Sequence, residues 1–144
     1  MPLCVLEDQV PPEWADYNGH MSAPCYAVAF GKANDQAMEA LDLGHAYRER
    51  TGYALYVVEA RYTYRLGMGG GDAYKLCTWL GGADDKRLSF THRMTRDDGR
   101  TAAEAEILFV HVNYSGSCAV PFAPRLRARL TGMSALAHLR SPAA

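Results

Sequence analysis

The sequence predicts an α+β fold in which an antiparallel sheet wraps around one long central helix, and three observations predict it. A single apolar stripe with helical spacing runs from about residue 22 to residue 43. Four long strand-like stretches follow, separated by residues that favour turns. The chain has 144 residues, of which 49% are hydrophobic and 22% charged, so it can bury a core as one domain over residues 1–144.

The long helix has a recognisable beginning and end. Ser22 suits the N-cap position, and Pro24 suits the first turn, where its missing N–H costs nothing. Gly44 is expected to end the helix. A short second helical piece is expected over residues 45–50. The apolar stripe consists of Ala23, Tyr26, Ala27, Phe30, Ala33, Ala37 and Leu41.

The strands follow from alternation and turn chemistry. Turns are expected at GMGGGD (67–72), GGADD (81–85) and RDDG (96–99), so the long strands should follow one another as hairpins. The predicted elements are a short strand at 3–9, long strands at 53–64, 73–80, 86–95 and 101–114, and a terminal helix at 125–139.

Several of these strands carry apolar residues on both faces, as Ile107 to Val110 illustrates. One face would cover the helix, and the other face needs cover as well. A second copy of the chain is the simplest source of that cover. We therefore expect a homodimer or a tetramer.

The overall composition excludes several classes of function. A net charge of -1 gives no field that would attract nucleic acid or an anionic membrane. No apolar run of 18 residues and no signal peptide are present. The four cysteines are far apart without a CxxC pair, and the histidines lack the spacing of metal ligands. We expect reduced thiols, no metal and a cytoplasmic protein.

The stretch PEWADYNGHMSAP (12–24) combines an acid with a helix beginning. A carboxylate can act as a nucleophile or a base, and main-chain N–H groups can donate to an oxyanion. The Asp16 carboxylate is suited to the first role, and the free N–H groups of the helix N-terminus are suited to the second. The alternative interpretation is that Asp16 only forms a turn, as Asp often does.

Two blocks of sequence carry a resemblance to a known family. The stretch DYNGHM (16–21) fits a D-x-x-G-H pattern, and KRLSF (86–90) is a basic block on a later strand. With the predicted sheet and helix, the chain resembles hotdog-fold thioesterases of the 4-hydroxybenzoyl-CoA thioesterase type over residues 5 to 130. One departure is visible, because Ser22 replaces the Asn that family members usually carry after the motif.

A narrower resemblance rests on several separated blocks. They are similar to a subgroup that is associated with L-carnitine dehydrogenase, and the activity assigned to that subgroup is hydrolysis of betainyl-CoA to glycine betaine and CoA. The blocks are PEWADYNGHM, AFGKANDQ, VVEARYTY, GADDKRLSFTHRM, FVHVNY and VPFAP.

The resemblance implies roles for individual residues. Asp16 matches the family's catalytic acid, and Asn18 and His20 are candidates to orient the carbonyl or the water. No cofactor is needed, because water is the second substrate. The CoA phosphates are expected to meet basic side chains near one strand. Those candidates are Lys86, Arg87 and Arg93.

Glu59 is the second acid of interest. Strict alternation puts it on the same strand face as Tyr53, Leu55 and Val57, where an acid needs a partner. Arg61 is the ordinary partner. The alternative is a cationic acyl group, since a trimethylammonium group is bound by aromatic faces and a nearby carboxylate. Candidate aromatic residues for that pocket include Tyr26, Tyr47 and Tyr53, whereas Tyr62 and Tyr64 are expected to pack in the sheet.

Three functions therefore remain open from the sequence. The first is a thioesterase for betainyl-CoA. The second keeps the chemistry but takes a neutral aromatic or medium-chain acyl-CoA, with Glu59 paired to Arg61. The third is a hotdog protein that binds acyl-CoA without hydrolysing it, because a fold alone does not prove an activity.

Overall fold

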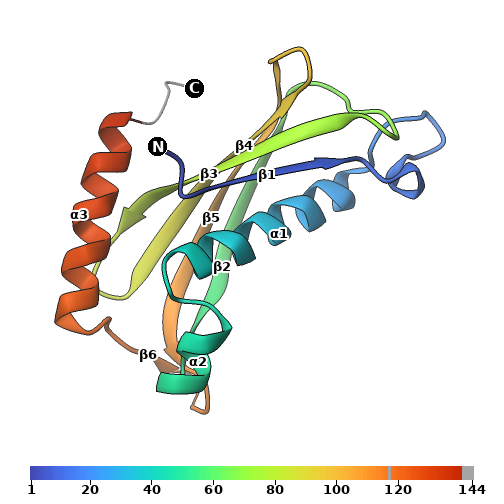
Figure 1. Cartoon of the computed structure of the whole chain (residues 1–144). Helices are drawn as coiled ribbons and strands as arrows, with labels where there is room; N and C mark the ends of the chain where they lie inside the picture. Colours follow the sequence, from blue (N-terminus) through green and yellow to red (C-terminus); the bar gives the residue numbers. More distant parts are fainter. Residues whose placement is uncertain (117, 141–144) are drawn as a thin grey trace.

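The computed structural model describes residues 1–116 and 118–140 and has the predicted α+β architecture (Figure 1). One six-stranded antiparallel sheet curves around a single long helix. The elements in chain order are β1 (Cys4–Gln9), a short 3-10 turn (Pro12–Trp14), α1 (Ala23–Ala40), α2 (His45–Thr51), β2 (Tyr53–Tyr64), β3 (Ala73–Ala83), β4 (Arg87–Arg96), β5 (Thr101–Asn113), β6 (Cys118–Ala119) and α3 (Pro124–Arg140). No helix of the described chain is long and apolar enough to cross a membrane.

The order of the strands differs from a simple series of hairpins. The sheet runs β1-β3-β4-β5-β2, with β6 paired to β5. β2 pairs with β5 over most of its length. β2 is therefore at the edge of the sheet, and β4 and β5 lie between it and β3. The predicted hairpin at Gly67–Asp72 is therefore wrong. This glycine-rich segment is a crossover that passes from the β2 edge to β3.

α1 buries the apolar stripe that the sequence predicts. Phe30, Ala33 and Ala37 have no exposed surface, and the alanines allow close packing against the sheet. The buried side of α1 lies against the concave side of the sheet (Figure 1). The stripe therefore fixes which side of α1 faces the sheet.

The end of α1 differs from the prediction. The helix ends at Ala40, and Asp42 takes the left-handed conformation (φ 58°) that Gly44 was expected to supply. The N–H of Leu43 donates to the carbonyl of Met38 (2.9 Å), which closes the last turn in a Schellman arrangement. Gly44 instead precedes α2, where a Cβ would collide with the Glu39 carboxylate.

A β-bulge in β2 changes which residues share a face. The pairing with β5 shifts between Val57 and Glu59, so that Val57 lies opposite Phe109 and Glu59 lies opposite Leu108. Glu59 therefore points to the face opposite to that of Val57. The predicted shared face of Glu59 with Tyr53, Leu55 and Val57 is wrong, although Glu59 and Arg61 do share a face.

The sheet's two faces are less alike than the sequence suggested. Ile107 and Phe109 of β5 are buried on the α1 side, whereas Glu104, Glu106 and Leu108 lie on the other face. On β4, Ser89 and Thr91 share that polar face. The expected need to cover a second apolar face is therefore weak. Exposed apolar surface lies instead along the β2 edge, at Tyr56, Val57 and Val58.

α3 lies next to the C-terminal end of α1. It packs against β3, and its Leu130 is fully buried in the main core. Arg129 of α3 donates from Nη2 to the carbonyl of Leu41 (2.8 Å), just after the last turn of α1. A cation at a helix C-terminus is favourable because of the helix dipole.

Candidate active site

The Asp16 loop is a tight two-stranded turn. Ala15 and Met21 form a β-bridge, and the Asp16 N–H donates to the His20 carbonyl (2.8 Å). Gly19 has a φ of 78°, a conformation that costs little only for glycine. The sequence D-x-x-G-H thus dictates the shape of this loop before any chemistry is considered.

The two oxygens of the Asp16 carboxylate have different surroundings. Oδ1 accepts hydrogen bonds from the N–H groups of Asn18 (2.8 Å) and His20 (3.2 Å), which is the turn-forming role that Asp often takes. Oδ2 has no hydrogen-bond partner among residues 1–116 and 118–140. The side chain is exposed to solvent. The carboxylate is therefore held in one orientation and has one oxygen free to react.

Asn18 and His20 support Asp16 through their main-chain N–H groups. The Asn18 side chain is exposed, and the His20 ring lies beside Gly67, 3.4 Å from the position that a Cβ would take there. Neither side chain hydrogen-bonds to a described residue. The catalytic roles expected for Asn18 and His20 stay predictions.

The glycine-rich crossover holds the Asp16 loop in place. The Met21 N–H donates to the Met68 carbonyl (2.6 Å), and His20 forms a β-bridge with Gly69. Gly70 comes so close to Pro12 that a Cβ would lie 3.3 Å from its Cα. The predicted hairpin at residues 67–72 gave this segment no contact with the Asp16 loop. The run of glycines was the available signal, because glycine permits such close backbone approach.

The N-terminus of α1 offers a free donor close to this loop. Ser22 occupies the N-cap position as predicted, but its hydroxyl is directed to Cys25 Sγ (3.2 Å) and caps no N–H. Pro24 has no N–H. The Ala23 N–H has no hydrogen-bond partner in the described part of the chain. This donor at the positive end of a helix is suited to stabilise an oxyanion.

A cavity of about 280 Å³ lies beside this helix end. Tyr26 of α1 and Tyr64 of β2 meet edge-to-face in it, with ring centroids 5.0 Å apart. Burial raises the pKa of Tyr26, so its hydroxyl stays protonated at neutral pH. The lining residues are Met21, Ala23, Tyr26, Tyr64, Arg65, Leu66 and Gly67. Tyr26, a candidate for the acyl pocket, therefore lines this cavity together with Tyr64, which was expected only to pack in the sheet.

Tyr47 and Tyr53 lie at the other end of the molecule. They belong to α2 and to the start of β2, beyond the C-terminus of α1, which is about 27 Å long. His111 Nδ1 donates to the Val120 carbonyl (2.9 Å), so its Nε2 accepts from the Tyr47 hydroxyl (2.8 Å). Tyr53 packs against the same imidazole. Within one protomer, these two tyrosines do not reach Asp16.

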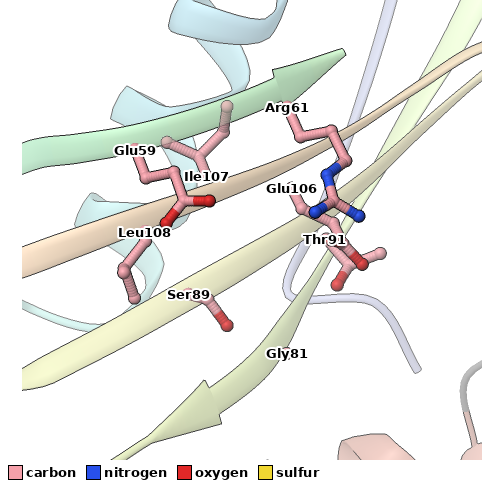
Figure 2. Close-up of a pocket in the computed structure, with 8 residues that line it drawn as sticks. All are labelled: Glu59, Arg61, Gly81, Ser89, Thr91, Glu106, Ile107 and Leu108. Carbon is pink, nitrogen blue, oxygen red and sulfur yellow. The ribbon is translucent and has the colours of Figure 1, made fainter. Parts of the chain in front are cut away.

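Glu59 lines a different hollow, on the face of the sheet away from α1. Figure 2 shows Glu59 and Arg61 lying over the sheet on the same side as Ser89 and Thr91. This hollow has a volume of about 400 Å³ and a largely polar lining. The arrangement does not bring Glu59 together with Asp16, Tyr26 or the end of α1.

The three basic candidates do not form one cluster. Arg87 pairs with Asp84 (Nη2 to Oδ2, 2.8 Å), and Lys86 beside it is exposed. Burial alone would raise the pKa of Asp84, but hydrogen bonds from Lys86 and Arg87 lower it overall. Arg93 lies about 20 Å along β4 from Arg87 and stacks against Trp79. Only Lys86 and Arg87 share one end of the sheet.

A curved antiparallel sheet around one helix, with an acid held just before that helix, defines the hotdog class of acyl-thioester proteins. Solved structures agree with this fold. A Staphylococcus aureus protein solved in complex with CoA matches with a TM-score of 0.83 at 23% identity, covering 97% of this chain and 86% of that one. A DHNA-CoA thioesterase from the same species matches with a TM-score of 0.83 at 15% identity, covering 96% and 95%.

The chain belongs to the Thioesterase-like superfamily, whose family model matches residues 10–130. A betainyl-CoA thioesterase of Pseudomonas aeruginosa is 31% identical over 97% of this chain and 88% of its own length. An L-carnitine dehydrogenase/betainyl-CoA thioesterase of Agrobacterium fabrum is 34% identical over 97% of this chain. The chain spans 28% of that longer relative. The family and the fold predicted from the sequence are confirmed.

Proposed function

We propose that this protein is an acyl-CoA thioesterase that hydrolyses betainyl-CoA to glycine betaine and CoA. The observation that carries the proposal is the Asp16 carboxylate, held by two N–H groups with one oxygen free, next to the free N–H of Ala23. Membership of the thioesterase family supports the reaction class. The names of the two relatives support the substrate.

The proposed reaction uses only side-chain and main-chain groups and water. Asp16 attacks the thioester carbonyl carbon, or takes a proton from a water that attacks it. The carbonyl oxygen gains negative charge, which the Ala23 N–H and the α1 dipole stabilise. The C–S bond then breaks and CoA leaves as a thiolate. If Asp16 attacked directly, water hydrolyses the resulting anhydride and restores the carboxylate.

We infer that the working form is a homodimer joined along β2. The apolar residues exposed on this edge strand support pairing with a second copy, since long apolar edges seldom stay bare. An antiparallel two-fold near Val58 would set Tyr64 of one protomer beside Tyr53 of the partner subunit. Such pairing would join the two groups of predicted tyrosines that a single protomer keeps apart.

Hydrolysis of betainyl-CoA by Asp16→Asn tests the proposed function. Asn keeps an oxygen that accepts the two N–H bonds of the turn but cannot act as nucleophile or base. We expect kcat to fall roughly a hundredfold or more, with the melting temperature unchanged.

Asp8→Asn is the matched control. Asp8 is also exposed and also accepts one main-chain N–H, from Gln9, yet it lies on β1. It should retain full activity. An Asp16→Asn variant as active as the wild type would favour the hypothesis of acyl-CoA binding without hydrolysis.

A further inference from the structure

The proposed substrate sets a strict geometric condition on its cation site. In betainyl-CoA, one CH₂ group separates the quaternary nitrogen from the thioester carbonyl carbon. That nitrogen and that carbon are therefore only about 2.5 Å apart, as N and C are in a glycine residue. When the carbonyl oxygen points to the Ala23 N–H, the trimethylammonium group must lie in the same cavity. Aromatic rings at the other end of α1 within the same protomer are too far away.

Two aromatic side chains of the described chain line that cavity, Tyr26 and Tyr64. Tyr26 is 5% exposed and is therefore fixed in the core. Tyr64 packs against it at an interplanar angle of 66° but remains 49% exposed, so much of its ring is open to a ligand. Met21 and Ala23 join the rings to the Asp16 loop and to the helix end.

We propose that Tyr64 is the specificity-determining residue for a cationic acyl group, with Tyr26 as the residue that positions its ring. A trimethylammonium group has no N–H to donate, so an aromatic face is the partner that suits it. This inference rests on the proposed thioesterase function and names how its substrate is recognised. In this proposal Tyr64 takes the place of Glu59 as the residue that binds the cation, because Glu59 faces the other side of the sheet.

The charges around the cavity are compatible with a cation. Arg65 also lines it, but its Nε and Nη2 both donate to the Glu104 carboxylate (3.4 and 3.3 Å), which compensates part of its charge, since Glu104 also pairs with Arg93 (4.0 Å). The Asp16 loop contributes Met21 to the same cavity and carries a free carboxylate oxygen. The negative charge of Asp16 therefore favours a cation beside the reacting carbonyl.

The test compares two substrates of nearly equal shape. One is betainyl-CoA, and the other is 3,3-dimethylbutanoyl-CoA, in which carbon replaces the quaternary nitrogen. The ratio of their kcat/KM values does not depend on the fraction of active enzyme. It combines recognition of the charge with the higher intrinsic reactivity of betainyl-CoA, whose electron-withdrawing nitrogen activates the carbonyl, so recognition is measured by the change in this ratio between the wild type and a variant. We expect the wild type to prefer betainyl-CoA by about tenfold or more.

Three variants locate that preference. Tyr64→Leu should lower the ratio about tenfold while still hydrolysing the neutral substrate, and Tyr64→Phe should leave the ratio close to that of the wild type because the ring remains. Val5→Ala is the control, since Val5 is 45% exposed on β1, the edge of the sheet opposite to β2. It should leave the ratio unchanged.

The outcomes separate this inference from the proposed function. Turnover of both substrates at equal rates by the wild type overturns the cationic subsite but leaves the thioesterase standing. A ratio that Tyr64→Leu leaves unchanged, or that Val5→Ala lowers equally, overturns the assignment to Tyr64. A wild type that hydrolyses neither thioester overturns both proposals.

Discussion

At the scale of single residues, His92 links α1 to the sheet. Its Nε2 hydrogen-bonds to Asn34 Oδ1 of α1, and its Nδ1 to Thr78 Oγ1 of β3, each at 2.7 Å. Because Asn34 Oδ1 only accepts, Nε2 carries the proton and Nδ1 accepts from the Thr78 hydroxyl. The ring is neutral, fully buried and packed against Phe30 and Phe90.

This arrangement predicts a loss of stability in mild acid. Burial lowers the pKa of His92 from 6.5 to about 4. The unfolded chain therefore binds the proton first, and the free energy of unfolding falls as the pH drops from about 6.5 towards 4. The contribution of His92 to this loss between pH 7.5 and 5 should be about 2 kcal/mol.

Urea unfolding of the wild type and of His92→Gln at both pH values measures the effect. The variant is the control for all other titrating groups, so the quantity of interest is the difference between the two losses. Equal losses in the two proteins would contradict the prediction.

At the scale of elements, the C-terminal end of α1 contains a residue, Asp42, that lowers the free energy of unfolding. Asp42 adopts a left-handed φ of 58°, which is unfavourable for a residue with a Cβ, and its negative charge lies at the negative end of the helix. Asp42→Gly should therefore stabilise the protein by about 1 kcal/mol and raise its melting temperature by a few degrees. Calorimetry on Asp42→Gly and Asp42→Ala checks this, because Ala removes the charge but keeps the Cβ. A Gly variant no more stable than Ala would show that the backbone carries no such cost.

The elements also show how far local sequence determines the fold. The bounds of β2 follow from its alternation and its flanking turn residues, and the match with residues 53–64 is complete. The bulge at Val57–Glu59 has no such local signal, since it depends on pairing with β5. The bulge places Glu59 on the face of the sheet opposite to the one that strict alternation predicts. Gly67–Asp72 has a hairpin's composition, but strand order is a property of the whole sheet.

The candidate site also combines residues that local sequence indicates with residues that only the tertiary structure indicates. The sequence predicts Asp16 as the catalytic acid because an acid next to a helix N-terminus and the family pattern agree, and that role stays a prediction. The sequence does not predict the role proposed for Tyr64, because tyrosines are ordinary strand residues and only the tertiary packing of the end of β2 against the start of α1 sets Tyr64 apart.

At the scale of the whole molecule, β2 is an exposed edge and β1 is the other. Val58 of β2 is 55% exposed and Val5 of β1 is 45% exposed, so the two strands offer matched positions. β2 is twice as long, with 12 residues against 6, and exposes neighbouring apolar side chains. A charge in a paired edge is costly, whereas a charge on a free edge is harmless. Val58→Lys should therefore shift the protein from dimer towards monomer, and Val5→Lys should not.

Light scattering after size exclusion measures this against the chain mass of 15.8 kDa. A monomeric wild type, or equal shifts in both variants, would rule out pairing through β2. If Val58→Lys is monomeric, its substrate preference carries further information. The cavity beside Tyr64 would then lose the cover of the partner subunit, and water would weaken the attraction between the ring and the cation. The preference for betainyl-CoA over its neutral isostere should fall in that monomer, which would tie the oligomeric state to recognition of the acyl group.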